Sequence, residues 1–191
     1  MRDMKFLKTH TEVLSYSLMF FIVAVTGCPG DHLIVYYRHE INSAVSYSAV
    51  SYAKSRAGST FFLGCKGPDF FDCTGLITWA YRKVDSSIVF KTQDGLSTTP
   101  TVNELYYLNI LPVDRYHVRC GDIVFITSIS EKPIGQNVVI THSGLFMDWI
   151  NSNKFRFINA SSYHGKVVID SFLVSDTVRG QRLAGFGRLL R

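Results

Sequence analysis

The chain has 191 residues, of which 47% are hydrophobic and 18% charged, and its formal net charge is +5. This length fits one domain, and the apolar share excludes a disordered chain. The basic residues are scattered without a Lys/Arg block, so we expect no nucleic-acid partner; a basic chain suits an anionic surface such as membrane lipid or a cell-wall polymer. Four Cys are too few for a disulfide scaffold or a structural zinc site.

The first 27 residues have the pattern of an export signal. Basic residues precede an apolar run from Leu18 to Val25, which is shorter than the roughly 20 residues that a spanning helix needs. The segment Val25-Thr26-Gly27-Cys28 resembles the end of a bacterial lipoprotein signal, in which the cysteine is lipidated and becomes the first residue. We expect a signal peptide over 1–27, a lipid anchor to a membrane at Cys28 and a tether over 28–41. An ordinary signal peptide that ends near a Cys is the alternative.

Two helices are expected next. Asn42 is a suitable N-cap for a helix with apolar residues at helical spacing, and Gly58 is a natural stop. The second helix begins at Cys73 after a loop over 64–71. Its apolar residues recur at i, i+3 and i+4 as far as Val84, which places them on one face. A long loop over 91–102 and a short helix over 103–108 follow.

The remainder of the chain reads as strands. We expect them over 123–126, 138–147, 155–160 and 167–169, separated by turns rich in Gly and Asn. Helices first and strands afterwards predict an α+β fold with an antiparallel sheet. A single domain over 42–191 accounts for all of these elements.

Cys73 is the first candidate for chemistry. Asp72 is a good helix cap, and a thiol in the first turn of a helix feels the positive end of the helix dipole. Such thiols can have a pKa well below the ordinary value of about 8.5, so we expect a reactive thiolate. The alternative is a buried small hydrophobic residue, the role that we assign to Cys65 and Cys120.

A nucleophilic thiol needs a proton carrier, and His142 is the best candidate. It lies within an expected strand beside Ser143 and Gly144, whose small side chains leave space for the imidazole ring. A His in a strand is more often structural than catalytic, and His164 lies in an expected turn nearby. The residues alone leave these possibilities open.

Four motifs together resemble the NlpC family of papain-like cysteine peptidases. The segment Phe71-Asp72-Cys73-Thr74-Gly75-Leu76 is similar to the family's Asp-Cys-Ser-Gly-Leu, and His142-Ser143-Gly144-Leu145-Phe146 to its His-Val-Gly-Ile-Tyr strand. Between them, Gly121-Asp122-Ile123-Val124-Phe125 resembles Gly-Asp-Leu-Val-Phe. Finally, Phe157-Ile158-Asn159-Ala160-Ser161 matches Phe-Ile-His-Ala-Ser. The resemblance runs from about Ala44 to Arg188.

The resemblance implies a papain-like core, with the nucleophile helix packed on an antiparallel sheet. It implies hydrolysis of amide bonds in the stem peptides of bacterial peptidoglycan, commonly between D-glutamate and the following diamino acid. Cys73 would be the nucleophile, His142 the base and Asn159 the third polar group, in a place that is usually His. Asp72 and Thr74 would help form the substrate site.

One loop departs from the family pattern. Phe61 replaces a Tyr whose hydroxyl lies near the nucleophile, so Phe61 would line the substrate site without that hydroxyl. This leaves room for a papain-like amidase or acyltransferase acting on another amide or ester. An inactive wall-binding lipoprotein is the third possibility.

Thiol chemistry needs no cofactor, and no cluster of residues has metal-ligand spacing. The export signal and the resemblance together predict an exported monomer of the bacterial cell envelope, either anchored to a membrane or secreted.

The position of Asn159 can be predicted from hairpin geometry. A four-residue loop over 149–152 would place His142 directly opposite Asn159, with both side chains on one face. The amide oxygen would then accept a hydrogen bond from the His142 ring and leave the other ring nitrogen for Cys73. A slip of one residue would turn Asn159 to the other face.

Overall fold

The structure is a computed structural model that describes residues 38–135 and 137–191. Its helices are α1 (Ser43–Lys54), α2 (Cys73–Val84) and α3 (Val102–Leu108). Its strands are β1 (Thr60–Phe61), β2 (Phe70–Phe71), β3 (Phe90–Thr92), β4 (Gly95–Ser97), β5 (Ile110–Val113), β6 (Ile123–Ser128), β7 (His142–Asn151), β8 (Lys154–Ser161), β9 (Lys166–Leu173) and β10 (Gln181–Leu189). The expected signal peptide over 1–27, Cys28 and most of the expected tether lie outside the described residues.

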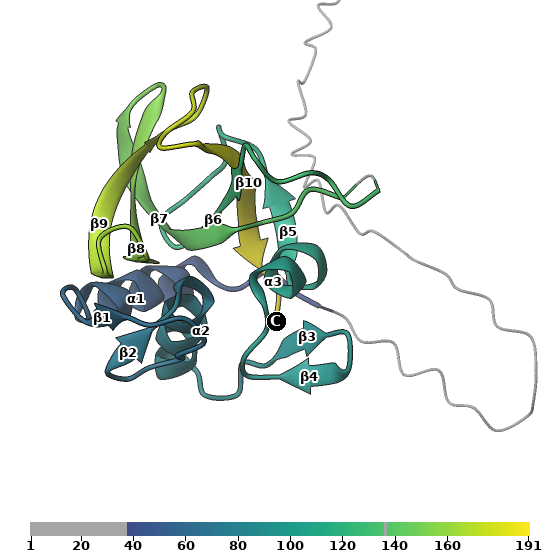
Figure 1. Cartoon of the computed structure of the whole chain (residues 1–191). Coiled ribbons are helices and arrows are strands. Elements are labelled where there is room, and N and C mark those ends of the chain that lie inside the picture. Colours follow the sequence, from purple (N-terminus) through teal and green to yellow (C-terminus); the bar gives the residue numbers. More distant parts are fainter. Residues whose placement is uncertain (1–37, 136) are drawn as a thin grey trace, which may run out of the picture. The chain divides into compact units, whose positions relative to one another are not determined.

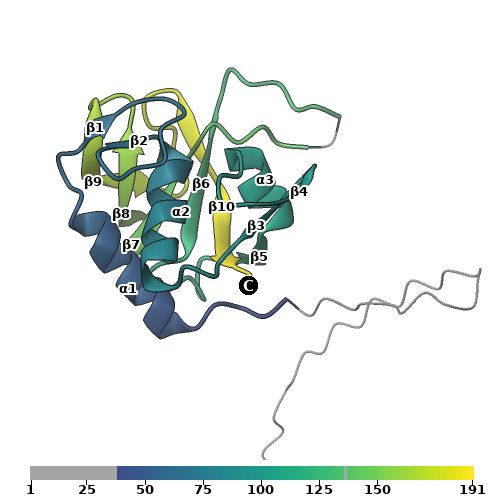
Figure 2. The same ribbon diagram turned by 90° about the horizontal axis from the view of Figure 1, so that it is seen from below.

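Helices α1 and α2 lie on one side of a curved sheet. The strand order is β2-β1-β9-β8-β7-β6-β10-β5, and all neighbours are antiparallel except the short pair β1 and β2. The long strands bend away from the helices (Figure 1). Seen from below, α1 and α2 run beside each other across β7 and β8, and α3 and the β3–β4 hairpin lie toward β5 and β10 (Figure 2). This arrangement confirms the predicted α+β fold, in which the helix that begins at Cys73 packs on an antiparallel sheet.

Helices α1 and α2 begin where their capping residues predict. Asn42 caps α1, with its side-chain oxygen 2.8 Å from the backbone nitrogen of Ala44. Asp72 caps α2, which begins at Cys73 and ends at Val84 as the apolar spacing predicts. Helix α3 begins one residue earlier than predicted, because Thr101 and Glu104 form a reciprocal capping box.

The strands differ more from expectation. The strand predicted over 138–147 begins at His142 and runs on to Asn151. The loop predicted over 91–102 contains the second strand of the β3–β4 hairpin. Strand β10 was not predicted, because Gly185 and Gly187 interrupt the alternation that identifies a strand. Gly187 is needed there: a Cβ would come 2.7 Å from the Ile110 side chain on β5.

Two apolar clusters hold the sheet. One fills the layer between the helices and the sheet and includes Leu76 and Ile77 of α2 and Leu145 of β7. The other lies on the opposite face of the sheet and is mostly aromatic, with Phe146, Phe155, Phe157, Phe172 and Phe186 as members. Side chains of successive residues in β7 therefore alternate between the helix layer and the aromatic cluster.

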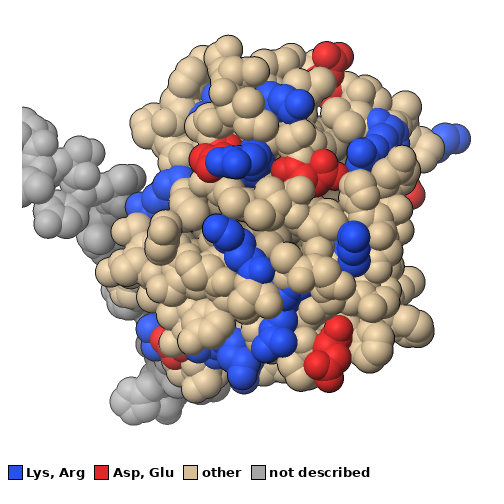
Figure 3. Space-filling model, turned by 90° about the vertical axis from the view of Figure 1, so that its left-hand side faces the viewer, with Lys and Arg blue, Asp and Glu red and all other residues tan. Residues whose placement is uncertain are grey.

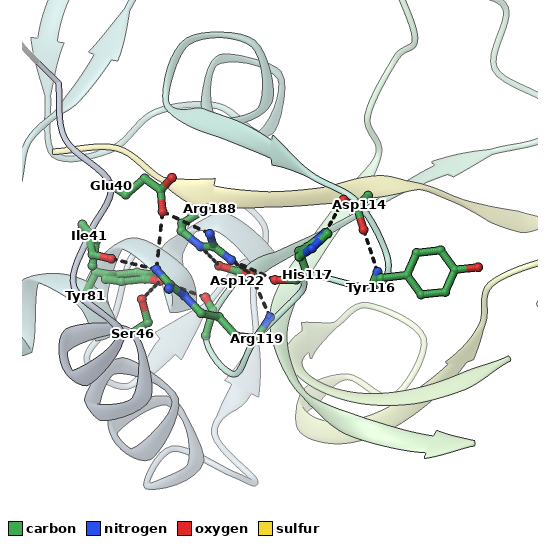
Figure 4. Close-up of polar contacts among 11 residues, drawn as sticks. Glu40, Ile41, Ser46, Tyr81, Asp114, Tyr116, His117, Arg119, Asp122 and Arg188 are labelled. Carbon is green, nitrogen blue, oxygen red and sulfur yellow. Dashed lines mark hydrogen bonds and ion pairs between the residues drawn. The ribbon is translucent and has the colours of Figure 1, made fainter. Parts of the chain in front are cut away.

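A polar centre joins the ends of the domain. Arg188 of β10 makes two 3.0 Å bonds to the carboxylate of Asp122 and a third, of 3.1 Å, to Glu40 (Figure 4). The backbone of His39 and Ile41 bonds to the backbone of residues 191 and 189. Residues 38–41 of the segment predicted as a tether are thus bonded to the domain.

Within the described residues, no helix is both long enough and apolar enough to cross a bilayer. On the face at the left of Figure 1, Lys and Arg form several separate groups with acidic side chains beside some of them (Figure 3).

Candidate active site

Cys73 is the first residue of α2, and its neighbours fix the start of that helix. The Asp72 side chain accepts a 2.6 Å bond from the backbone N–H of Gly75. The preceding loop crosses directly over this turn, so a Cβ at Gly75 would lie 2.3 Å from the carbonyl oxygen of Cys65. Only glycine allows this approach, which explains why the sequence Asp72-Cys73-Thr74-Gly75 forms a helix start beneath a loop.

Asp72 holds the loop as well as the helix. Its carboxylate accepts from the Lys66 ammonium at 2.8 and 3.0 Å, from the Gly64 backbone at 3.1 Å and from the Thr74 hydroxyl at 3.0 Å. Lys66 also reaches the Thr74 oxygen at 2.8 Å. The carboxylate therefore fixes the wall of the site next to Cys73. No sequence pattern marks Lys66, which lies in a loop seven residues before Cys73.

His142 and Asn159 are joined by a hydrogen bond. The distance from His142 Nε2 to Asn159 Oδ1 is 3.0 Å, and Asn159 is 1% exposed. The amide nitrogen of Asn159 donates to the carbonyl of Val168 on β9 at 3.5 Å, which turns the amide oxygen toward the ring. In this arrangement Nε2 carries the proton and Nδ1 is the free basic nitrogen.

The predicted hairpin register is wrong by two residues. Phe146 pairs with Phe157 rather than with Phe155, because the turn is tighter than predicted and the register shifts twice near it. A shift of two residues preserves the faces, so Asn159 remains on the side of His142 but lies diagonally from it. Gly144 lies across from Asn159, and a Cβ there would come 2.9 Å from the Asn159 Cβ. The absence of a side chain at Gly144 thus leaves the space in which His142 and Asn159 meet.

Cys73 and His142 line one cleft of about 540 Å³. Its walls come from the loop after β1, the start of α2, the start of α3 and the segment that enters β7. Phe61, Asp72 and Thr74, the three residues predicted to form the substrate site, line the same cleft. The fold therefore brings five of the six predicted domain residues to one surface, and Asn159 stands behind His142.

Burial favours the neutral forms of the thiol and the imidazole. Burial, and then the Asp72 carboxylate, raises the pKa of Cys73, while the side chain and backbone of Ser143 act in the opposite direction. The expected lowering of the Cys73 pKa is therefore wrong, because desolvation on burial disfavours the charged thiolate. Burial also lowers the pKa of His142, against the hydrogen bond from Asn159 and the charge of Asp170. A neutral imidazole is the form that can accept a proton from the thiol.

His164 does not take the place of Asn159. Its Nε2 lies 3.2 Å from the Asp170 carboxylate, which also pairs with Arg179 at 3.2 Å. Asp170 and Arg179 line a second pocket of about 290 Å³, which His142 and Asn159 also line. Asp170 and Arg179 lie in segments without a recognisable motif, so the sequence did not identify them.

In the described part of the chain, no group of three His, Cys, Asp or Glu side chains is placed to hold a metal ion. The groups at hand are those of thiol and imidazole chemistry.

Comparison with known proteins agrees with this geometry. The sequence profile described as the NlpC/P60 family matches residues 58–179, more than half of the chain. The chain belongs to the NlpC/P60 family. The matched residues include Cys73, His142 and Asn159 of this NlpC/P60 domain.

The relatives of this NlpC/P60 domain are longer proteins. A Corynebacterium glutamicum protein described as a probable endopeptidase is 30% identical over 82 residues, which are 43% of this chain and 34% of that protein. A second protein with that description, from strain R, matches with the same figures. The chain thus spans about a third of the length of these curated relatives.

Solved structures share the fold. NlpC2 from Trichomonas vaginalis superposes with a TM-score of 0.55 at 24% identity, over 79% of this chain and 50% of that one. A Staphylococcus aureus protein described as similar to a lipoprotein of the NLP/P60 family gives 0.54 at 20% identity, over 83% and 46%.

Proposed function

We propose that this chain is a cysteine peptidase that hydrolyses amide bonds in peptidoglycan stem peptides through Cys73, His142 and Asn159. The observation that carries the proposal is the His142–Asn159 hydrogen bond, which leaves Nδ1 free at the cleft that Cys73 lines. The Corynebacterium glutamicum relative that is described as a probable endopeptidase supports peptide hydrolysis as the reaction class. We place the cut between D-glutamate and the diamino acid, as the motif resemblance implies.

The reaction follows from these groups. His142 Nδ1 takes the proton of the Cys73 thiol as the sulfur attacks the carbonyl carbon of the scissile amide. Backbone N–H groups at the start of α2 and the helix dipole stabilise the oxyanion that forms. The imidazolium then gives its proton to the leaving amine. Water, activated by the same imidazole, hydrolyses the thioester and restores the thiol. Asn159 holds the ring in the tautomer that each step needs.

The decisive experiment is the digestion of purified peptidoglycan. We expect fragments with a new amino terminus at the diamino acid, identified by mass, and none from Cys73→Ala. Circular dichroism must show that this variant is folded, and Cys120→Ala serves as the matched cysteine control. Release of intact stem peptides from the glycan would instead identify an amidase. Binding without any cleavage would identify a wall-binding protein and contradict the proposal.

A cell-envelope location follows from such a substrate. The signal peptide over 1–27 and the lipid anchor at Cys28 rest on the sequence, since both lie outside the described residues. Mass spectrometry of the native protein tests them: a lipidated amino terminus at Cys28 is expected. A mature form that begins at Met1 would contradict export by this signal.

A further inference from the structure

Ser143 lies immediately after His142, on the opposite face of β7. It pairs with Phe125 of β6 and shares its face with Leu145, a member of the apolar cluster that α2 also enters. Its side chain therefore points into the layer between β7 and α2, where Cys73 begins the helix. Ser143 is 0% exposed. His142 and Ser143 are thus successive residues of β7, and their side chains lie near Cys73 on opposite faces of that strand.

The Ser143 hydroxyl has no hydrogen-bond partner among the described residues. Its oxygen is buried and makes no hydrogen bond within the described residues, one of three such side-chain atoms there. A buried hydroxyl without a partner is costly, and apolar packing would favour a residue such as Val or Ala at this position. The polar group beside it is the Cys73 thiol, whose pKa the Ser143 side chain and backbone lower. A neutral thiol is a weak acceptor, whereas a thiolate is a strong one.

We propose that the Ser143 hydroxyl donates a hydrogen bond to the Cys73 sulfur when the thiol gives up its proton, and so stabilises the attacking thiolate. The proton passes from Cys73 Sγ to His142 Nδ1, while Ser143 keeps its own proton and shares it with the sulfur. The hydroxyl is unpaired in the resting state and becomes paired as charge develops. Such an interaction favours the reacting state over the ground state, which is what accelerates a reaction. The inference rests on Cys73 being the nucleophile of the proposed function, but not on the identity of the substrate.

Three other groups set the charge around Cys73. The negative charge of Asp72, the cap of α2, disfavours the Cys73 thiolate. The Lys66 ammonium lies 2.8 Å from the Asp72 carboxylate and compensates part of that negative charge. His142 faces the same cleft from β7. None of the three bonds to the Ser143 hydroxyl. A change at Ser143 therefore leaves these three groups in place and isolates the effect of the hydroxyl.

The test is the pH dependence of Cys73 alkylation by iodoacetamide, followed on the Cys73 peptide by mass spectrometry. In Ser143→Ala we expect the midpoint to move to higher pH, with a loss on the order of tenfold in rate at pH 7. The limiting rate at high pH should stay unchanged, because the intrinsic access to the sulfur is the same. Ser143→Thr, which keeps the hydroxyl, should retain the wild-type midpoint.

Ser46→Ala is the matched control, since Ser46 is a buried serine of α1 that bonds to Tyr81. Its alkylation profile should equal that of the wild type. A folded Ser143→Ala protein with the wild-type midpoint would overturn the inference. So would an equal shift in Ser46→Ala. Because alkylation needs no peptide substrate, this result stands apart from whether peptidoglycan is cleaved.

Discussion

Two polar centres lie inside this domain, and they differ in how completely their groups are paired. At Arg188 and Asp122, both carboxylate oxygens and all three guanidinium nitrogens have partners at 2.9 to 3.1 Å (Figure 4). At Cys73 and His142, one ring nitrogen is bonded through Asn159, and the buried Ser143 hydroxyl is unpaired. The first centre holds strands together, whereas the second keeps acceptors and donors free for a reaction.

The protonation states differ in the same sense. Asp122 and Glu40 raise the pKa of Arg188 against the effect of its burial, so the charged form is held. Burial raises the pKa of Cys73 and lowers that of His142, so the neutral forms are favoured in the resting site. A saturated ion pair resists change, while a neutral thiol and imidazole can exchange one proton. The following predictions test this contrast.

The largest effect is expected on the stability of the domain, when the ion pair of Arg188 and Asp122 is broken. Asp122→Ala removes one partner of a buried pair and leaves the Arg188 charge uncompensated, which should lower the free energy of unfolding by about 3–5 kcal/mol. Urea denaturation measures it. The exposed pair of Asp148 and Arg156 is the control, and Asp148→Ala should cost far less. An equal loss in both variants would show that the buried centre has no special role.

The next largest effect is expected on activity, when the hydrogen bond between His142 and Asn159 is removed. Asn159→Ala leaves the His142 ring without its orienting bond, so we expect kcat/KM to fall by about 10- to 100-fold. Asn159→His should keep part of the activity, because its ring can still accept a hydrogen bond. The free energy of unfolding should change less than in Asp122→Ala. Full activity of Asn159→Ala would remove Asn159 from the catalytic group.

A smaller effect is expected in the pH profile. Because burial lowers the pKa of His142, the imidazole stays unprotonated at mildly acidic pH. The acid limb of kcat/KM should therefore lie below the ordinary histidine value of about 6.5. The Asn159 bond raises this pKa, so the limb should move to still lower pH in Asn159→Ala. A limb above the ordinary value would contradict this assignment of the base.

The smallest effects are expected at the other described cysteines. Cys120 packs against the helix-side cluster, and Cys65 serves through its backbone oxygen, which accepts from the Asp72 N–H at 2.8 Å. Cys65→Ala and Cys120→Ala should each keep activity within about twofold of wild type. If Cys120→Ala lost turnover while Cys73→Ala stayed active, Cys120 rather than Cys73 would be the nucleophile.

Some features of the site follow directly from the sequence. The bounds of α2 follow from the cap at Asp72 and the apolar spacing that ends at Val84, because both signals are local. The shared face of His142 and Asn159 follows from strand alternation, which survives a shift of two residues.

Other features depend on contacts between distant segments. The hairpin register depends on bulges near the turn, which no residue pattern marks. Strand β10 depends on Ile110 packing over Gly187, a contact between residues far apart in the chain. The pKa of Cys73 depends on how deeply the fold buries it. The unpaired state of Ser143 likewise depends on which segments surround it.

The pairing of His39 with the backbone of residue 191 has a topological consequence. Because these two points of the chain touch, a short linker can join them, and new ends can be opened in the exposed segment around Pro133. That segment lies between Cys73 and His142 in the sequence. A circularly permuted chain of this kind would carry His142 before Cys73 while keeping the same cleft. The order of the two residues is therefore a matter of ancestry, and only their meeting in space is required by the chemistry.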